Sequence, residues 1–262
     1  MDADALRALM LQIEWGADEA LQDVPFDRLA TIEPPFPQQA AGTGAKPAAM
    51  VVPAPASPSR AGAAERAAEI AAAAATLEEL RAAICGFEGC ALRDTATGPV
   101  VFEGDPASGL LLISGPPGAE DDRAGRLLSG PDGDFLDAML ASVGLTRSGL
   151  IATPVIPWRP PGGRPPGASE LAICMPFLHR LIVLARPRLA ILLGPLPARI
   201  LLGPERRGRG QLIRADVAGA DEPLPCLAIA APDQLRRGSD RRAAAWADLR
   251  RLRRLLNQNT HS

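Results

Sequence analysis

Apolar residues in the second half of the chain form short runs that alternate with longer segments of helical periodicity. Short apolar runs bounded by glycine or proline are typical of buried strands, and apolar residues repeating every three or four positions are typical of helices. The expected elements, in chain order, are Leu110–Ser114, Phe135–Leu145, Leu150–Ile156, Ser169–Leu184, Leu189–Gly194, Leu196–Leu202, Leu227–Ala230 and Arg241–Leu256. This alternation predicts an α/β fold of three layers, α/β/α, in which helices cover both faces of a central, mostly parallel sheet.

Glycine and proline residues follow the carboxyl ends of several expected strands. They occupy positions 115–118 after the first strand and 157–163 after the second, and Pro232 follows the last strand. In open α/β sheets the ligand crevice lies outside the carboxyl ends of the strands. We therefore expect the functional site along this edge.

The N-terminal part of the chain has a different character. Residues 3–21 place apolar side chains on one helical face with acidic residues behind them, and residues 33–60 hold seven prolines among alanine and glycine. Such a proline-rich stretch cannot sustain a helix or a sheet, whereas the alanine-rich run Ala61–Ile84 has strong helix propensity. The pattern predicts an acidic helical segment at 1–32, a disordered linker at 33–60 and a globular domain at 61–262.

The formal net charge of −2 is unevenly distributed along the chain. Residues 1–33 carry eight acidic side chains against two arginines, whereas residues 186–262 carry fifteen arginines against seven acidic side chains, a local excess of +8 (15 − 7). A local basic face is enough to neutralise phosphates. The C-terminal part is thus compatible with nucleic-acid binding, and equally with a solvated arginine-rich surface.

Signals for export and membrane insertion are missing from the sequence pattern. No apolar run reaches the roughly eighteen residues that span a bilayer, and Met1–Glu14 lacks the basic start and apolar stretch of a secretory signal. The four cysteines are few and scattered, which argues against a disulfide framework. We therefore expect a cytoplasmic protein without a membrane segment, whose cysteines are reduced thiols or metal ligands.

Five segments of the expected domain carry motifs that occur together in one order. They are LLLISGPPGAEDDRAGRLLSGPDGDFLDAMLASVGL at 110–145, TPVIPWRPPGGRPP at 153–166, ELAICMPFL at 170–178, RPRLAILLGPLPARILLG at 186–203 and IAAPDQLRRGSDRRAAAWADL at 229–249. In order and spacing the chain resembles the family 4 uracil-DNA glycosylases, bacterial enzymes that usually contain a [4Fe-4S] cluster. The resemblance implies the α/β fold of that superfamily and an origin in DNA base-excision repair.

The resemblance implies where catalytic groups should lie. Enzymes of this family flip uracil out of the DNA stack and cleave its glycosidic bond with the help of a positioned water and electrostatic stabilisation. The positions of the catalytic motifs in this chain are Gly115, Pro117, Gly118, Asp121, Asp122 and Ala231. The family's water-orienting acidic residue aligns with Gly115, and its charge-stabilising histidine aligns with Ala231.

The base pocket departs from the family pattern in the same way. The phenylalanine expected to stack on the base aligns with Leu128, and the asparagine expected to bind the uracil edge aligns with Pro154. A leucine has no π-face, and a proline has neither a polar side chain nor a backbone N–H. The sequence therefore predicts weak or absent uracil excision with residual DNA binding.

Three alternatives remain open at this point. The protein could be an active glycosylase that uses Asp121 or Asp122 as a replacement base. It could be a non-catalytic interaction module that recruits a protein partner through residues 1–32, or a sensor of DNA lesions. The acidic N-terminal segment supports the second hypothesis, because an amphipathic helix on a long linker is suited to partner binding.

Arginines near the motif loops are candidates for DNA phosphate contacts. They are Arg159 and Arg164 in the WRPPGGR loop and Arg236 and Arg237 after the last strand. Each could instead be a solvated surface residue. The arginines at 250, 251, 253 and 254 are expected on the exposed face of the last helix, opposite an apolar stripe that begins at Trp246.

Cysteine positions match the family's cluster ligands only in part. Cys85, Cys90 and Cys174 are the candidate metal ligands, but the first two are spaced C-x4-C, and Trp158 stands where the family has a further cysteine. Iron–sulfur clusters of this kind need four thiolate ligands. We expect that no cofactor is bound, that Trp158 fills the vacated space, and that Cys226 behaves as a small buried apolar residue.

Overall fold

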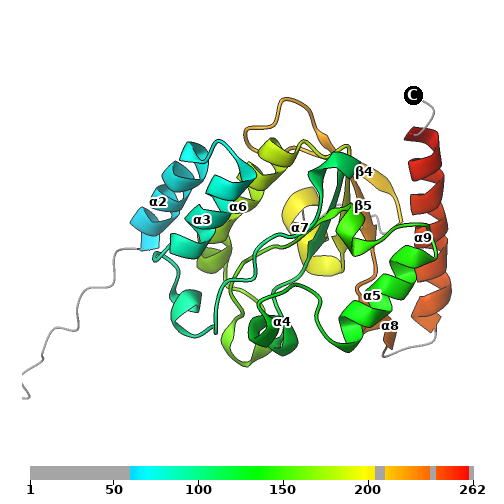
Figure 1. Cartoon of the computed structure of the whole chain (residues 1–262), viewed down its shortest axis with the longest axis horizontal. Helices are drawn as coiled ribbons and strands as arrows, with labels where there is room; N and C mark the ends of the chain where they lie inside the picture. Colours follow the sequence, from blue (N-terminus) through cyan, green and yellow to red (C-terminus); the bar gives the residue numbers. More distant parts are fainter. Residues whose placement is uncertain (1–59, 204–209, 237–239, 260–262) are drawn as a thin grey trace, which may run out of the picture. The chain divides into compact units, whose positions relative to one another are not determined.

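The computed structural model describes residues 60–203, 210–236 and 240–259 (Figure 1). The helices are α2 (Arg60–Ala73), α3 (Leu77–Gly86), α4 (Ala119–Ala124), α5 (Pro131–Ala141), α6 (Ala168–Ala185), α7 (Pro195–Leu202), α8 (Pro232–Arg236) and α9 (Asp240–Asn259). The strands are β1 (Leu110–Ser114), β2 (Ile151–Pro154), β3 (Leu189–Leu193), β4 (Leu212–Ala215) and β5 (Leu224–Ile229). The helical segment expected at 1–32 and nearly all of the linker expected at 33–60 lie outside the described residues.

The five strands form one sheet in the order β2-β1-β3-β5-β4. All neighbouring pairs are parallel except β4 and β5, which are antiparallel. Ser114 is in register with Pro154, and Leu193 with Ile229, so the carboxyl ends of the four parallel strands meet at one edge. The expected mostly parallel α/β sheet is confirmed.

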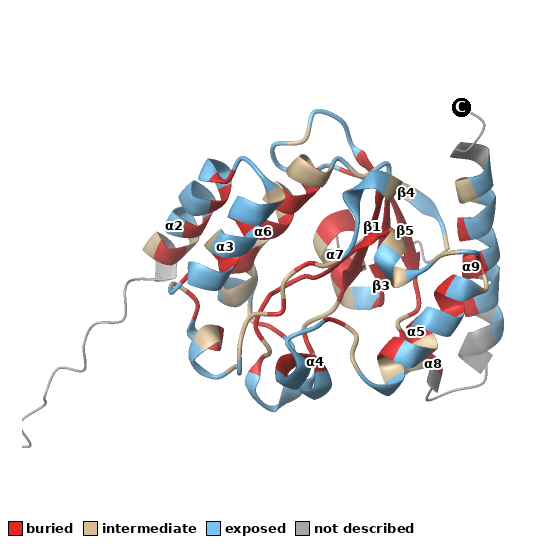
Figure 2. Cartoon of the chain, in the orientation of Figure 1, coloured by how far each residue is buried: buried red, intermediate tan, exposed pale blue. Residues whose placement is uncertain are grey.

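Helices cover both faces of the sheet, because alternate residues of each buried strand point to opposite faces. On β1, Leu111 and Ile113 belong to the core shared with α2, α3 and α6, whereas Leu110 and Leu112 belong to the core shared with α5, α8 and α9. Figure 2 shows the buried residues concentrated on the strands and on the inward faces of these helices. Two apolar cores therefore hold the sheet between two helical layers.

The alanine-rich segment, for which strong helix propensity was expected, forms two helices, α2 and α3. Thr76 ends the break between them and caps α3, since its Oγ1 accepts a hydrogen bond from the Glu79 N–H at 3.1 Å. The Glu79 carboxylate in turn accepts from the Ala75 N–H at 2.6 Å. This Thr-x-x-Glu sequence resembles a capping box, a start signal that overrides the helix propensity of the surrounding alanines.

Helix α6 is the central element of one helical layer. It buries Ile173, Cys174, Phe177, Leu178, Leu181 and Ile182. Among the described residues it is also the one helix that meets the length and composition criterion for crossing a membrane, although Glu170 and Arg180 interrupt its apolar residues. The core helix of an α/β domain meets the same criterion, and the buried face of α6 lies against α2, α3 and the sheet.

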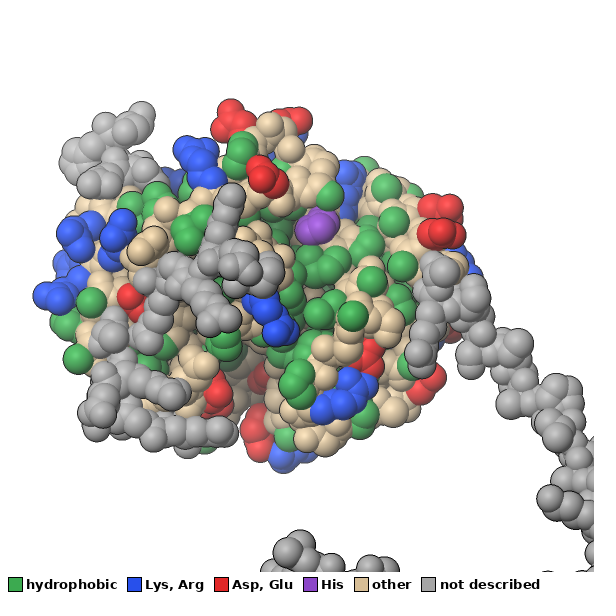
Figure 3. Space-filling model, turned by 180° about the vertical axis from the view of Figure 1, so that it is seen from behind, with side chains coloured by type: hydrophobic (Ala, Val, Ile, Leu, Met, Phe, Trp, Pro, Cys, Tyr) green, Lys and Arg blue, Asp and Glu red, His purple; other side chains and the backbone are tan. Residues whose placement is uncertain are grey.

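The last helix, α9, exposes a row of arginines. Arg250, Arg251, Arg253 and Arg254 are exposed, as expected, and Leu249 and Leu252 are buried. Figure 3 shows basic side chains grouped at the edge of the domain where α9 lies. Trp246 is 48% exposed, so the expectation that the apolar stripe begins with this residue is wrong.

Candidate functional site

A cleft of about 770 Å³ opens at the carboxyl edge of the sheet. It is bounded by the segments that follow β1, β2, β3 and β5. The candidate residues on its walls are Gly115, Pro117, Gly118, Asp121, Leu128, Arg159, Arg164 and Ala231. The fold therefore brings together residues that are more than a hundred positions apart in the sequence, at the edge where the strand pattern placed the site.

Prolines form much of the cleft wall. Nine lining residues are prolines, namely Pro116, Pro117, Pro131, Pro160, Pro165, Pro166, Pro195, Pro197 and Pro232. Each proline lacks a backbone N–H and has a fixed φ. The walls are consequently stiff and poor in hydrogen-bond donors, which are the groups that bind the carbonyl oxygens of a pyrimidine.

Gly115 lies in the loop after β1, at the position to which the family resemblance assigns an acidic residue. A Cβ atom added at Gly115 would have no neighbouring atom within 4 Å. The adjacent Ser114 hydroxyl donates to the Gly115 carbonyl at 3.0 Å. The space beside Gly115 is therefore open to a larger side chain.

Asp121 is held by backbone hydrogen bonds on both carboxylate oxygens. Its Oδ2 accepts from the Gly118 N–H at 3.0 Å at the start of α4, and its Oδ1 accepts from the Ser129 N–H at 2.7 Å. The residue is 7% exposed. Asp121 thus connects the loop after β1 to the turn that precedes α5, and each of its oxygens accepts one backbone hydrogen bond in this structural role.

Asp122 does not line the cleft. Its carboxylate accepts hydrogen bonds from the N–H of Thr97 at 2.9 Å and from the hydroxyl of Thr97 at 3.0 Å. These bonds attach α4 to the segment that precedes β1. A general base must come within hydrogen-bond reach of the water it activates, so the placement of Asp122 argues against this role.

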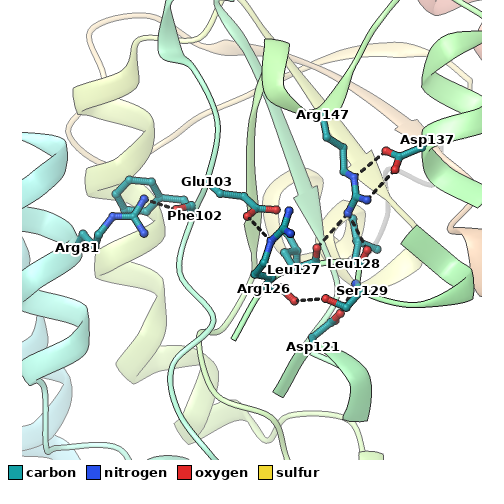
Figure 4. A network of polar contacts seen from close by, with 10 residues as sticks. All are labelled: Arg81, Phe102, Glu103, Asp121, Arg126, Leu127, Leu128, Ser129, Asp137 and Arg147. Carbon is teal, nitrogen blue, oxygen red and sulfur yellow. Dashed lines mark hydrogen bonds and ion pairs between the residues drawn. The ribbon is translucent and has the colours of Figure 1, made fainter. Parts of the chain in front are cut away.

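Leu128 lies on the cleft wall in an unusual backbone conformation. Its φ is +53°, a left-handed value that is rare for residues other than glycine. Arg147 donates to the carbonyl oxygens of Leu128 at 2.7 Å and Leu127 at 3.2 Å. The same guanidinium binds both carboxylate oxygens of Asp137, each at 2.7 Å, and this pairing raises the pKa of Arg147 (Figure 4).

Pro154 and Ala231 lie in different surroundings. Pro154 ends β2, is buried and borders a separate void of about 20 Å³ beside Phe177, so it is not part of the cleft wall. Ala231 follows β5 on the cleft wall. A Cβ added at Gly194 would lie 3.1 Å from the Ala231 Cβ, which shows that the ends of β3 and β5 approach closely there.

The basic candidates divide into free and paired arginines. Arg164 binds Glu170 through two hydrogen bonds of 2.9 and 2.5 Å, so its guanidinium supports the start of α6. Arg159 lies half-buried in the cleft and has no acidic partner among the described residues. Arg236 ends α8, while Arg237 lies outside the described residues.

Arg199 is a cleft residue that the sequence analysis did not single out. It lies on α7 and lines the cleft, and within the described ranges it has no acidic partner. Its place could have been inferred, because α7 begins at the carboxyl end of β3, the edge where the site was expected. Arg159 and Arg199 are thus the two cleft arginines available to a phosphate.

Two of the three candidate metal ligands are neighbours. Cys90 and Cys174 are buried and hydrogen-bonded to each other, which lowers the pKa of Cys90 to about 7 and raises that of Cys174 well above its ordinary value. Cys85 is exposed. The part of the chain that the structure describes contains no group of three or more His, Cys, Asp or Glu side chains able to hold a metal ion.

Trp158, at the position to which the family resemblance assigns a cysteine ligand, is fully buried. Its ring centroid lies 6.3 Å from that of Phe87, whose own ring is 5.2 Å from Phe177. The indole Nε1 has no hydrogen-bond partner among the described residues. An aromatic cluster with two thiols at its border does not supply the four thiolates of a [4Fe-4S] site.

The comparisons with known proteins agree with this architecture. Residues 101–250 match the model of the uracil DNA glycosylase superfamily. The chain belongs to this superfamily. It is 33% identical over 143 residues to the type-4 uracil-DNA glycosylase of Pyrobaculum aerophilum, an alignment that covers 55% of this chain and 72% of that protein.

Two further relatives carry the same name. The type-4 uracil-DNA glycosylase of Sulfurisphaera tokodaii is 31% identical over 120 residues, covering 45% of this chain and 54% of that protein. The enzyme of Archaeoglobus fulgidus is 30% identical over 126 residues, and this alignment covers 48% of this chain and 63% of that protein. The family 4-like resemblance is confirmed.

Proposed function

We propose that this protein is a family 4-like member of the uracil-DNA glycosylase superfamily that binds DNA at its cleft and excises uracil weakly or not at all. The supporting observation is the cleft itself. It retains the position and loops of a base-binding site, but Gly115 and Ala231 provide no acid and no imidazole at the two positions to which the family resemblance assigns catalysis.

Neither Asp121 nor Asp122 is suited to replace the missing acid. Asp121 uses both oxygens to accept backbone N–H groups, and Asp122 faces Thr97 outside the cleft. Loss of one positioned acid, base or oxyanion donor typically lowers a rate by about two to four orders of magnitude. With two such groups replaced, little excision should remain, so the hypothesis of an active glycosylase using either aspartate is disfavoured.

DNA binding depends on groups that are still present. Arg159 and Arg199 face the cleft without acidic partners in the described segments, and arginine contacts to phosphate need no particular base. The cleft volume of about 770 Å³ also falls within the range that holds a small organic ligand. The second hypothesis, a protein-interaction role for residues 1–32, concerns residues outside the described part and stays a prediction.

The proposal is tested with uracil-containing DNA. Purified protein is incubated with single-stranded and G·U duplex oligonucleotides, and alkali-labile abasic sites are counted against the Pyrobaculum aerophilum enzyme as an active reference. We expect binding that weakens with salt, and excision at least about a hundredfold slower than the reference. Excision at a comparable rate would refute the proposal.

Restoring the missing groups provides the matched control. The double variant Gly115→Glu with Ala231→His should gain excision, because the space at Gly115 is open. The variant Gly115→Gln with Ala231→His has nearly the same volume but no carboxylate, and it should gain less. Equal rates for the two variants would show that the restored acid does not act in catalysis.

A further inference from the structure

The segment Arg126–Gly130 connects α4 to α5 and forms one rim of the cleft through Leu128 and Ser129. We call this segment the Leu128 rim. Two of its residues have left-handed backbone conformations, Leu128 with φ +53° and Gly130 with φ +68°. A non-glycine residue in this region persists only where surrounding contacts hold it, and such residues concentrate at functional sites.

Arg147 supplies the main contact that holds the rim. It lies in the short turn Arg147–Gly149 before β2, and its Nη1 donates to the carbonyl oxygens of Leu127 and Leu128. Its Nε and Nη2 bind the two oxygens of Asp137 on α5. All three nitrogens of the guanidinium are therefore used, and they connect the rim, α5 and the start of β2.

Two further contacts fix the rim from other directions. Asp121 accepts the Ser129 N–H, and in Figure 4 it lies on the opposite side of the rim from Arg147. On α5, a Cβ added at Gly133 would lie 1.7 Å from the Leu128 carbonyl oxygen, so the rim packs directly against the first turn of this helix. The backbone of Leu128 has little freedom to move toward or away from the cleft.

Arg147 itself is not part of the cleft wall, whereas Leu128 is. Arg147 can therefore act on a bound ligand through the Leu128 rim, whose residues Leu128 and Ser129 line the cleft. The leucine side chain is half-buried at the wall and offers an aliphatic surface without polar atoms. Such a surface can pack against the face of a base that has left its stack, and it has no group that distinguishes one base edge from another.

We propose that Arg147 is a positioning residue that holds Leu128 as a fixed aliphatic wall for an extrahelical base of bound DNA. The proposal rests on the proposed DNA-binding function and adds a specific contact to it. It follows that the wall contributes to affinity only when a base is present in the cleft. An abasic nucleotide has no base to contact Leu128, so its affinity should not depend on this wall.

The test compares wild type with Arg147→Met, which keeps an unbranched, flexible side chain and removes every donor. Binding is measured to a G·U mismatched duplex and to the same duplex with a tetrahydrofuran abasic analogue in place of the uridine. We expect about a tenfold loss of affinity for the G·U duplex, which corresponds to the lost burial of one or two methylene groups, and less than about a twofold change for the abasic duplex. Arg123→Met is the control, since Arg123 is an exposed arginine of α4 that pairs with Glu120.

A second measurement requires no DNA. Hydrogen exchange at the Ser129 amide should be at least about tenfold faster in Arg147→Met than in wild type or Arg123→Met, because the rim opens more often. Arg147→Lys, with one ammonium group in place of five N–H donors, should restore only part of the protection. Unchanged exchange in Arg147→Met would overturn the positioning role.

The outcomes separate the two proposals. Equal losses of affinity for the G·U and abasic duplexes would mean that Arg147 acts through charge or general stability, and the inference would fail while DNA binding stands. Absence of binding by wild type to either duplex would refute the proposed function and, with it, the wall for a base. Selective loss on the G·U duplex together with faster exchange would support the inference.

Discussion

The cleft edge and the core beneath α6 each contain a position to which the family resemblance assigns a functional residue, and this chain fills the two positions in physically opposite ways. At the cleft edge a small residue, Gly115, leaves space where an acidic side chain is expected. In the α6 core a large residue, Trp158, occupies the position of a cysteine ligand and is fully buried. The first replacement leaves the fold's packing unaffected, whereas the second has become part of it. A substitution in open cleft space and a substitution in the buried core are therefore expected to differ strongly in their effect on stability.

The largest expected effect comes from emptying the α6 core. Trp158→Ala should lower the free energy of unfolding by about 3–5 kcal/mol, since it removes an aromatic side chain from a fully buried site. Urea unfolding followed by circular dichroism measures the loss. Trp246→Ala is the control, because Trp246 is 48% exposed and should change stability by less than about 0.5 kcal/mol. Similar losses in both variants would contradict the packing role of Trp158.

An intermediate effect is expected for the polar contacts at the cleft edge. Asp121→Ala should cost about 2–3 kcal/mol, because the N–H groups of Gly118 and Ser129 lose their acceptor. The neighbouring Glu120→Ala removes only an exposed ion pair with Arg123 and should cost less than about 1 kcal/mol. Chemical denaturation of the two variants side by side checks the difference, and a smaller loss for Asp121→Ala than for Glu120→Ala would reverse our interpretation.

A smaller effect is expected from the pH dependence of the same α6 core. Burial raises the pKa of Cys226 to about 12, whereas the thiol of an unfolded chain ionises near pH 8.5. The protonated Cys226 thiol therefore makes its full contribution to the stability of the folded protein below about pH 8.5. As the pH rises above this value the folded protein loses stability, by about 1.4 kcal/mol at pH 9.5. The decrease in the free energy of unfolding between pH 7 and pH 9.5 should be smaller in Cys226→Ala than in wild type, by about the same 1.4 kcal/mol. An identical pH dependence in the variant would show that this thiol is not protonated in the folded state.

The smallest effect is expected at Gly115. Gly115→Glu alone should change the unfolding free energy by less than about 0.5 kcal/mol, because its side chain enters open cleft space. Thermal unfolding gives the comparison with wild type. If Gly115→Glu lost as much unfolding free energy as Trp158→Ala, the cleft edge and the α6 core would not differ in their tolerance of substitution.

The sequence pattern was sufficient for elements whose signals are local and strong. The first strand, Leu110–Ser114, was placed with its observed bounds, since a continuous apolar run followed by glycine and proline has few alternatives. The edge strand β4 was missed because it is mostly exposed and Arg214 interrupts its apolar residues. The break before α3 was missed because composition was given more weight than the Thr76 capping signal.

Site residues were predictable where a motif fixes their position. Gly115 and Ala231 lie in one cleft because their loops follow parallel strands, and Leu128 joins them through the segment between α4 and α5. The roles of Asp121 and Arg147 were not predictable, since their partners lie on turns whose geometry depends on the packed structure. Trp158 was assigned to the vacated cluster position, but its contact with Phe87 becomes visible only once α3 and the loop after β2 are in place.

The nine prolines of the cleft have a consequence for how binding would proceed in time. Walls with fixed φ angles lose little conformational entropy when a ligand enters, so the free and occupied proteins should share one backbone arrangement. The described walls of the cleft would then need no closing step to admit a ligand. Extrusion of the base from its duplex would set the rate, and damaged or mismatched sites, which open most easily, would be occupied first.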